Sequence, residues 1–270
     1  MTNRTASCRI ARYFPAVAVV ASILACIMPK FAQANNVSIR VDGRVVLASL
    51  MSISDGHLQD IENSLKTLAG TEEARTLDWN KIKGPLARVE QRSVPAAMWF
   101  SLPDGAYWTV EQGHVSENLS DRPYFPRLLA GKDVIGDLVV SKSTGKAVAI
   151  VAVPVMKNGA VIGMLGSSVY LDKLGSLLEK EMALDKTMIF YSFNSEPLVG
   201  LDWDPQLIFL EPMKQNNESL KRAFREMLSR NDGTVSYEYR GRVRNVIYRK
   251  SPVTNWWYAF GLVEGDREVK

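Results

Sequence analysis

The sequence predicts an α+β fold in which a long N-terminal helix precedes two modules built on antiparallel sheets. Three observations carry this prediction. Leucines recur at helical spacing across residues 44–69. The dipeptide Asn158-Gly159 separates two apolar runs, as in a tight β-hairpin. From residue 186 onward, a strand pattern is followed by a helical pattern and three further strand patterns.

The chain divides into five expected segments. They are a signal peptide over residues 1–34, an N-terminal helical segment over 35–70, a first module over 71–182, a second module over 183–265 and a tail over 266–270. Each segment beyond the signal peptide follows from a change in periodicity, and the chain after residue 34 is long enough for one large or two small domains.

The N-terminus has the pattern of an export signal. Arg4, Arg9 and Arg12 precede an apolar run, and Ala32-Gln33-Ala34 supplies small residues where a signal peptidase reads the chain. The apolar run is shorter than the ~20 residues of a membrane-spanning helix. We therefore expect cleavage after Ala34 and a periplasmic protein. Lipid attachment at Cys26 is the less favoured alternative, because Leu24 makes a loose lipobox.

Removal of residues 1–34 changes the charge balance of the chain. The full sequence has 33 Lys and Arg against 29 Asp and Glu. Four basic residues and no acidic ones lie in the signal, so the mature chain is balanced. Nucleic acid is therefore not expected as a partner, because phosphate backbones require a positive face. Both cysteines also leave with the signal unless Cys26 carries a lipid, so we expect no disulfide.

The predicted elements of the N-terminal half follow in order. The first helix ends at Gly70, and a second helix begins after Asp78 as N-cap, with Gly84-Pro85 as a weak point. Residues 97–110 read as strand, turn and strand around Pro103-Asp104-Gly105. The remaining elements of the first module are a strand over 134–142, a turn over 143–146, a hairpin over 147–170 and a helix over 171–182.

The second module is also predicted to combine strands with a helix. A strand over 186–191 precedes a helix over 217–230, whose apolar face carries Leu220, Phe224, Met227 and Leu228. Three strands then follow, over 234–239, 242–250 and 255–263. In the first of these, Val235, Tyr237 and Tyr239 are expected to point inward.

The sequence does not favour an enzyme, a metal site or a cofactor. Residues 143–146 resemble the end of a phosphate-binding loop, but Val140 and Ala147 occupy positions that need glycine and a hydroxyl residue. The two histidines, His57 and His114, lie far apart in the sequence. The pair Asp202 and Asp204 is interpreted as a solvated turn.

Aromatic residues cluster around Arg122. Trp99, Phe100, Tyr107, Trp108, Tyr124 and Phe125 fall within a short stretch of the first module. One interpretation is an ordinary core, with Arg122 in a salt bridge to Asp121 or another surface acid. The other is a small-ligand pocket in which Arg122, at a helix start beside Pro123, holds an anion through its guanidinium and the free N–H groups of the helix.

Residues 119–174, together with 102–110 and 233–263, resemble the extracytoplasmic sensory Cache domains of bacterial chemoreceptors and histidine kinases. The resemblance implies a double Cache arrangement: a long helix, then a distal and a proximal PAS-like module, with ligand in the distal one. Many amino-acid-binding members have Arg-x-Trp-Tyr at the helix start, where this chain has Arg122, Tyr124 and Phe125. The resemblance also implies that Ser168 stands where those members hold the ligand amine with Asp, and that Val139 replaces a Tyr.

The resemblance and the residues together predict a freestanding, exported sensor of signal transduction or chemotaxis that binds a small carboxylate or another anion. Arg122 is the expected anchor. The expected walls and secondary polar groups are Trp99, Tyr107, Trp108, Tyr124, Ser141, Lys142 and Ser168. Because the sequence stops at Lys270, we expect it to present its bound state to a membrane chemoreceptor or sensor kinase.

Two alternatives remain open at this point. A ligand-free protein with the same fold would act in structure or interaction, with the N-terminal helix forming a homodimer or docking to a membrane sensor. A hydrolase or other enzyme is the third interpretation, but the sequence offers no convincing pair of nucleophile and base.

Overall fold

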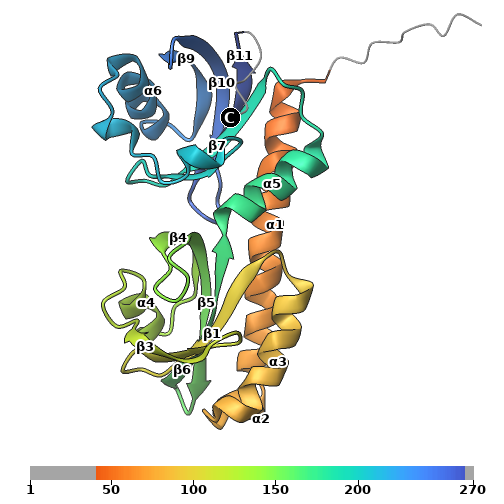
Figure 1. Cartoon of the computed structure of the whole chain (residues 1–270), viewed down its shortest axis with the longest axis vertical. Helices are drawn as coiled ribbons and strands as arrows, with labels where there is room; N and C mark the ends of the chain where they lie inside the picture. Colours follow the sequence, from red (N-terminus) through yellow and green to blue (C-terminus); the bar gives the residue numbers. More distant parts are fainter. Residues whose placement is uncertain (1–40, 265–270) are drawn as a thin grey trace, which may run out of the picture. The chain divides into compact units, whose positions relative to one another are not determined.

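A computed structural model describes residues 41–264 (Figure 1). The predicted signal peptide, with its cleavage at Ala34 and the alternative at Cys26, lies outside the described residues, as does the predicted tail. Within residues 41–264, no helix is both long enough and apolar enough to cross a membrane.

Two of the three N-terminal helices, α1 and α3, form where the sequence predicted them, and the short helix α2 between them was not predicted. Helix α1 spans Gly43–Ala69, with Asp42 as its N-cap and Gly70 as its C-cap. Helices α2 and α3 span Glu72–Arg75 and Trp79–Arg92. The Asp78 carboxylate caps α3 by accepting the Asn80 N–H at 3.0 Å. Pro85 lies inside α3 without ending it.

The first sheet has six antiparallel strands in the order β3-β2-β1-β6-β5-β4. Its strands span Ala96–Ser101 (β1), Ala106–Thr109 (β2), Gly113–Asn118 (β3), Val134–Val140 (β4), Ala147–Lys157 (β5) and Ala160–Tyr170 (β6). The predicted hairpin is confirmed, since Asn158 and Gly159 take φ angles of 51° and 79° between β5 and β6. Helices α4, Phe125–Leu129, and α5, Leu171–Met182, complete this part.

The second sheet has five antiparallel strands in the order β8-β7-β11-β10-β9. They span Met188–Phe193 (β7), Val199–Asp202 (β8), Asp232–Tyr239 (β9), Arg242–Lys250 (β10) and Trp257–Val263 (β11). Helix α6, Glu218–Leu228, lies between β8 and β9 in the chain, after two short 3-10 turns at Pro205–Leu207 and Pro212–Lys214. The expected inward side chains of β9 are buried. The α+β class with a long helix and two antiparallel sheets is therefore confirmed.

Three apolar clusters organise the packing. The largest joins the leucine stripe of α1 to one face of each sheet and to α5. In the other two, α6 covers the second face of the second sheet, and α4 with its flanking residues packs on the second face of the first sheet. Each sheet thus has an α1 face and an opposite face that carries a short helix (Figure 1).

A buried carboxylate ties α1 to the second sheet. Asp55, in the middle of α1, is 5% exposed. It accepts hydrogen bonds from Ser251 Oγ at 2.6 Å, Tyr258 Oη at 2.9 Å and Thr254 Oγ1 at 3.4 Å. Burial raises the pKa of Asp55, and the three hydroxyl donors oppose that rise. These bonds fix α1 against the turn between β10 and β11 and against β11 itself.

A second polar contact joins β4 of the first sheet to the start of β11. The indole Nε1 of Trp256 donates to the carbonyl oxygen of Gly136 at 2.8 Å. Gly136 has a φ of 85°, and a Cβ there would lie 3.0 Å from Thr254 Cβ. Glycine is required at this position for both reasons.

One sequence interpretation is wrong in this region. Asp202 does not lie in a solvated turn, because it ends β8 and is 5% exposed. Its carboxylate accepts the Asp204 N–H at 2.9 Å, and burial raises its pKa to about 8. Asp204 caps the following 3-10 turn and pairs with Arg240 at 3.4 Å.

We expect Asp55→Ala to lower the free energy of unfolding by about 2–4 kcal/mol, because three hydroxyl groups lose their acceptor. Denaturant unfolding of this variant measures the loss, and Asp60→Ala serves as the control. Asp60 is an exposed residue of the same helix, so its substitution should change stability by less than about 0.5 kcal/mol. Equal effects of the two substitutions would contradict a structural role for Asp55.

Asp202 should make stability depend on pH. Its raised pKa means that the folded state keeps a proton that the unfolded state loses between pH 4 and about 8. Stability from this group therefore falls as pH rises through that window, by at most about 1.4 kcal/mol per unit. Asp202→Asn removes the titrating carboxyl group and with it this fall in stability at higher pH. The difference in unfolding free energy, variant minus wild type, should be more positive at pH 8 than at pH 5. A difference independent of pH would contradict the raised pKa.

Candidate ligand-binding site

A small cavity lies on the α4 side of the first sheet. It is lined by Trp99, Tyr107, Leu119, Arg122, Tyr124, Val139, Ser141, Lys142, Ser143, Ile150 and Ser168. All the predicted site residues except Trp108 therefore lie around one space. Its volume is about 10 Å³, which is room for about one water molecule. A metabolite would enter only if the lining segments moved apart.

The aromatic wall depends on a glycine in the neighbouring strand. Trp99 of β1 is 2% exposed and pairs in register with Gly166 of β6. A Cβ at residue 166 would overlap the indole, so the absence of a side chain lets Trp99 lie across β6. Trp99 in turn stacks with Tyr124, with ring centroids 6.4 Å apart. Burial raises the pKa of Tyr124.

Trp108 is not part of this wall, contrary to the sequence prediction. Tyr107 and Trp108 are neighbours in β2, and successive side chains point to opposite faces of a sheet. Tyr107 faces the cavity, and Trp108 faces the α1 side. There it stacks on Phe100 at 5.7 Å and meets His114 at 5.2 Å.

Helix α4 begins later than predicted. It starts at Phe125, three residues after Arg122, and it has only five residues. The Arg122 N–H donates to Leu119 O at 3.0 Å, and the Phe125 N–H donates to Arg122 O at 2.9 Å. Pro123 has no N–H at all. The N–H groups of Arg122 and Phe125 are therefore used in turns, and Pro123 supplies none, so the side chain of Arg122 is the main candidate anchor for an anion in this segment.

The Arg122 guanidinium is only partly satisfied. Its Nη2 donates to the carbonyl oxygen of Val140 at 2.6 Å, while its Nε is buried without an acceptor. Among residues 41–264, no carboxylate lies within ion-pair distance of Arg122. The alternative salt bridge to Asp121 is thus not formed. Asp121 instead binds Lys142 Nζ, at 2.6 and 2.8 Å, and this contact lowers the pKa of Asp121.

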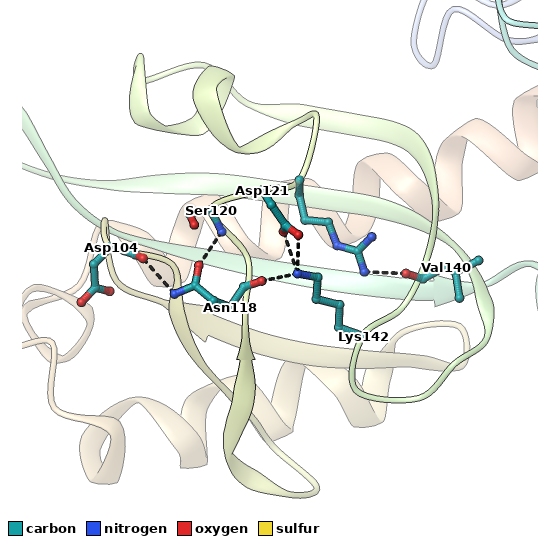
Figure 2. A network of polar contacts seen from close by, with 7 residues as sticks. Asp104, Asn118, Ser120, Asp121, Val140 and Lys142 are labelled. Carbon is teal, nitrogen blue, oxygen red and sulfur yellow. Dashed lines mark hydrogen bonds and ion pairs between the residues drawn. The ribbon is translucent and has the colours of Figure 1, made fainter.

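A polar network that includes Lys142 of the cavity wall links neighbouring segments of the first module (Figure 2). Lys142 Nζ also donates to Asn118 O at 2.6 Å. The Asn118 side chain accepts the Ser120 N–H at 2.7 Å and donates to Asp104 O at 2.9 Å. The turn at Asp104, the end of β3 and the residues that follow β4 are therefore linked to one another.

The Tyr107 hydroxyl is a second buried polar group that lacks a partner at this cavity. Burial raises the pKa of Tyr107. No lining residue is acidic, and Ser168 contributes a neutral hydroxyl. The cavity thus presents N–H and O–H donors and a positive charge, without a group to balance a ligand ammonium.

Several lining residues were not assigned to the site from the sequence. Leu119, Ser143 and Ile150 lie in the cavity wall, and Val139 does so too, in place of the tyrosine that the resemblance implies. Ile150 shares the α4 face with Val148 and Ala152 of β5. The alternation of side chains along β5 would have placed Ile150 in the cavity wall only if the register of the strand had been known.

Solved structures share this fold. No protein-family model matches the chain, and no curated protein does either. The extracellular domain of rpHK1S-Z16, described as a histidine kinase, is 16% identical, with a TM-score of 0.68 over 82% of this chain and 92% of that one. The ligand-binding domain of the Pseudomonas fluorescens chemoreceptor CtaA, solved with L-alanine, is 15% identical, with a TM-score of 0.62 over 83% and 95%.

A third match is an extracellular ligand binding receptor from Desulfohalobium retbaense DSM5692. It is 15% identical with a TM-score of 0.66, and it matches 81% of this chain but only 40% of its own length. At these identities the comparisons establish architecture. The chain has the double Cache fold of extracellular sensory domains from chemoreceptors and histidine kinases, as its resemblance implied.

We expect Gly166→Ala to destabilise the protein by about 1–3 kcal/mol, because the new methyl group displaces the Trp99 indole from β6. Gly56→Ala is the control: it lies inside α1 with no atom within 4 Å of its would-be Cβ, and should stabilise by about 0.5–1 kcal/mol. Thermal unfolding and tryptophan fluorescence measure both. Unchanged stability and emission in Gly166→Ala would contradict the packing of Trp99 described above.

Proposed function

We propose that this protein is an extracytoplasmic sensor that binds a small carboxylate, or a similar anion, in the cavity of the first sheet. The observation that carries the proposal is the Arg122 guanidinium, whose Nε is buried without an acceptor beside a cavity that has no acidic lining residue. A buried donor without a partner costs free energy, and an anion would remove that cost. The shared fold with ligand-binding sensory domains supports the same function.

The chemistry of the lining suits a carboxylate. A guanidinium holds a carboxylate through two parallel N–H donors, here Nε and a terminal nitrogen of Arg122. The Tyr107 hydroxyl is a further donor, and the rings of Trp99 and Tyr124 would exclude water from the contact. Ser141, Lys142 and Ser168 are secondary polar contacts in this proposal.

Ligand entry would require the segments that line the cavity to move apart. The Arg122 Nη2 would exchange the Val140 carbonyl for the ligand, and Lys142 would separate from Asp121 or move with it. The ion pair between Lys142 and Asp121 is exposed on the Asp121 side, so water screens it and its loss costs little. A ligand that favours the open arrangement shifts the protein towards it, and a membrane chemoreceptor or sensor kinase would read that change.

The small volume of the cavity favours a second candidate, a ligand-free interaction protein with the same fold. In that case Arg122 would only brace the end of β4, and a homodimer or a membrane sensor would engage the protein through α1. Export with cleavage after Ala34, a freestanding form and the absence of enzymatic activity belong to the proposal in either case.

Thermal shift against acetate, propionate, lactate and succinate, with matched amines, tests the proposal. We expect at least one carboxylate to raise the melting temperature. Arg122→Ala should then weaken its binding by about 2–5 kcal/mol, measured by titration calorimetry.

Arg127→Ala is the matched control, since Arg127 lies on α4, pairs with Asp137 and does not line the cavity. It should leave the affinity unchanged. If no acid on the panel stabilises the protein, the ligand-free candidate is favoured. If Arg122→Ala binds as tightly as wild type, Arg122 is not the anchor.

A further inference from the structure

The second sheet contains a cavity of its own on the α6 side. It is lined by Tyr191, Val199, Asp202, Leu207, Leu210, Leu220, Phe224, Tyr237, Tyr239 and Arg244. Its volume is about 20 Å³, close to that of the cavity in the first sheet. It lies on the corresponding face, away from α1. The lining of this cavity includes an acidic residue, Asp202, as well as a cation, Arg244, whereas the lining of the first cavity has no acidic residue.

The cation is Arg244 of β10. Its side chain points inward with Val246 and Tyr248, and the residue is 7% exposed. The guanidinium carbon lies 4.9 Å from the centre of the Tyr239 ring, and the Nε is buried without an acceptor. Within the described part of the chain, no carboxylate comes within ion-pair distance of it. A guanidinium buried in this way is only partly compensated by one aromatic ring.

The acid is Asp202 at the end of β8. It accepts one backbone N–H, from Asp204, and it forms no ion pair among residues 41–264. The charged groups that act on it are Arg244 from β10, Arg240 from the turn after β9, and Asp204, which is itself paired with Arg240. The charge of Asp202 is therefore poorly compensated, which agrees with its raised pKa.

Other polar groups of this cavity satisfy one another. The Tyr237 hydroxyl donates to the Tyr191 hydroxyl at 3.1 Å, and the Tyr191 hydroxyl donates to Met227 Sδ at 3.7 Å. Arg244 keeps a buried Nε without an acceptor although the Tyr237 hydroxyl lies beside its guanidinium, and Asp202 has no ion-pair partner among residues 41–264. Once Asp202 is ionised, the two residues place opposite charges in one cavity without an ion pair between them, which is a complementary template for a molecule that carries both signs.

We propose that the second sheet holds a separate site for a small zwitterion, whose carboxylate binds Arg244 and whose ammonium group binds Asp202. The cavity of about 20 Å³ holds little more than one water molecule, so a compact zwitterion would enter only if the lining around Tyr239, Phe224 and Leu210 moved apart. The two cavities would then differ in chemistry: the first takes an anion, and the second takes a molecule with both charges. This site does not depend on the function proposed for the first cavity.

Binding at this site should strengthen as pH rises towards 8. The ammonium group needs the ionised form of Asp202, which the free protein reaches only near its pKa of about 8. Below that value, affinity should fall by up to about tenfold per pH unit, because binding must remove a proton from Asp202. Binding of a simple carboxylate at Arg122 has no such requirement, so its affinity should be nearly constant from pH 6 to 8.

Titration calorimetry of the full chain at pH 8 tests the proposal with glycine, β-alanine and 4-aminobutyrate. These probes separate their two charges by one to three carbons, and propionate and propylamine serve as single-charge controls. We expect at least one zwitterion to bind at least tenfold more tightly than either control. Asp202→Asn and Arg244→Gln should each weaken that binding at least tenfold.

Two controls make the outcome decisive. Arg249→Gln changes an exposed arginine of the same strand and should have no effect, and Arg122→Ala should leave zwitterion binding intact. Asp202→Asn is nearly isosteric, so it remains informative if Arg244→Gln fails to fold. The proposal is overturned if no zwitterion binds, if single-charge analogues bind equally well, or if Arg122→Ala rather than Asp202→Asn removes the binding. None of these results bears on carboxylate binding at Arg122, except the last.

Discussion

The apolar stripe of α1, fixed in place by the buried Asp55 carboxylate, is the constraint on which the rest of the structure depends. The stripe packs against one face of each sheet, and the three hydroxyl donors to Asp55 hold the helix to the turn before β11 and to β11. The stripe thus covers much of one face of each sheet, although an open cleft of about 500 Å³ remains beside Arg44 and Leu47 at the start of α1. The two small cavities described above lie on the opposite faces, under α4 and α6.

Local sequence signals predicted the elements well where they were strong. The leucine spacing of α1, the Asn158-Gly159 turn and the span of β10 all matched the structure. Weak signals were missed. Strand β3 is short and polar, and β8 has only four residues. The start of α4 was misplaced because Pro123 suggested a helix start where the chain makes turns. The face of the sheet that a side chain occupies, and whether it is buried, were harder to predict. Trp108 and Asp202 were misassigned because only the strand register and the tertiary packing decide their surroundings.

The two cavities show how one architecture can present different charges. In each, an arginine from the sheet or its flanking turn has a buried Nε without an acceptor. In the first, Ser168 stands where the family resemblance implies an acid, and the lining has no carboxylate. In the second, Asp202 enters from the edge strand β8. Under the two proposals, the position of a single carboxyl group distinguishes a site for an anion from a site for a zwitterion.

Strand β4 has a role that its place at the sheet edge does not suggest. Its Gly136 carbonyl receives the Trp256 indole, and its Val140 carbonyl receives Arg122. The two acceptors are four residues apart, or about 13 Å along an extended strand. A route from the cavity of the first sheet to the second sheet thus runs through two hydrogen bonds, a few peptide units and one indole, rather than along the length of α1. A shift of this strand would reach both sheets at once.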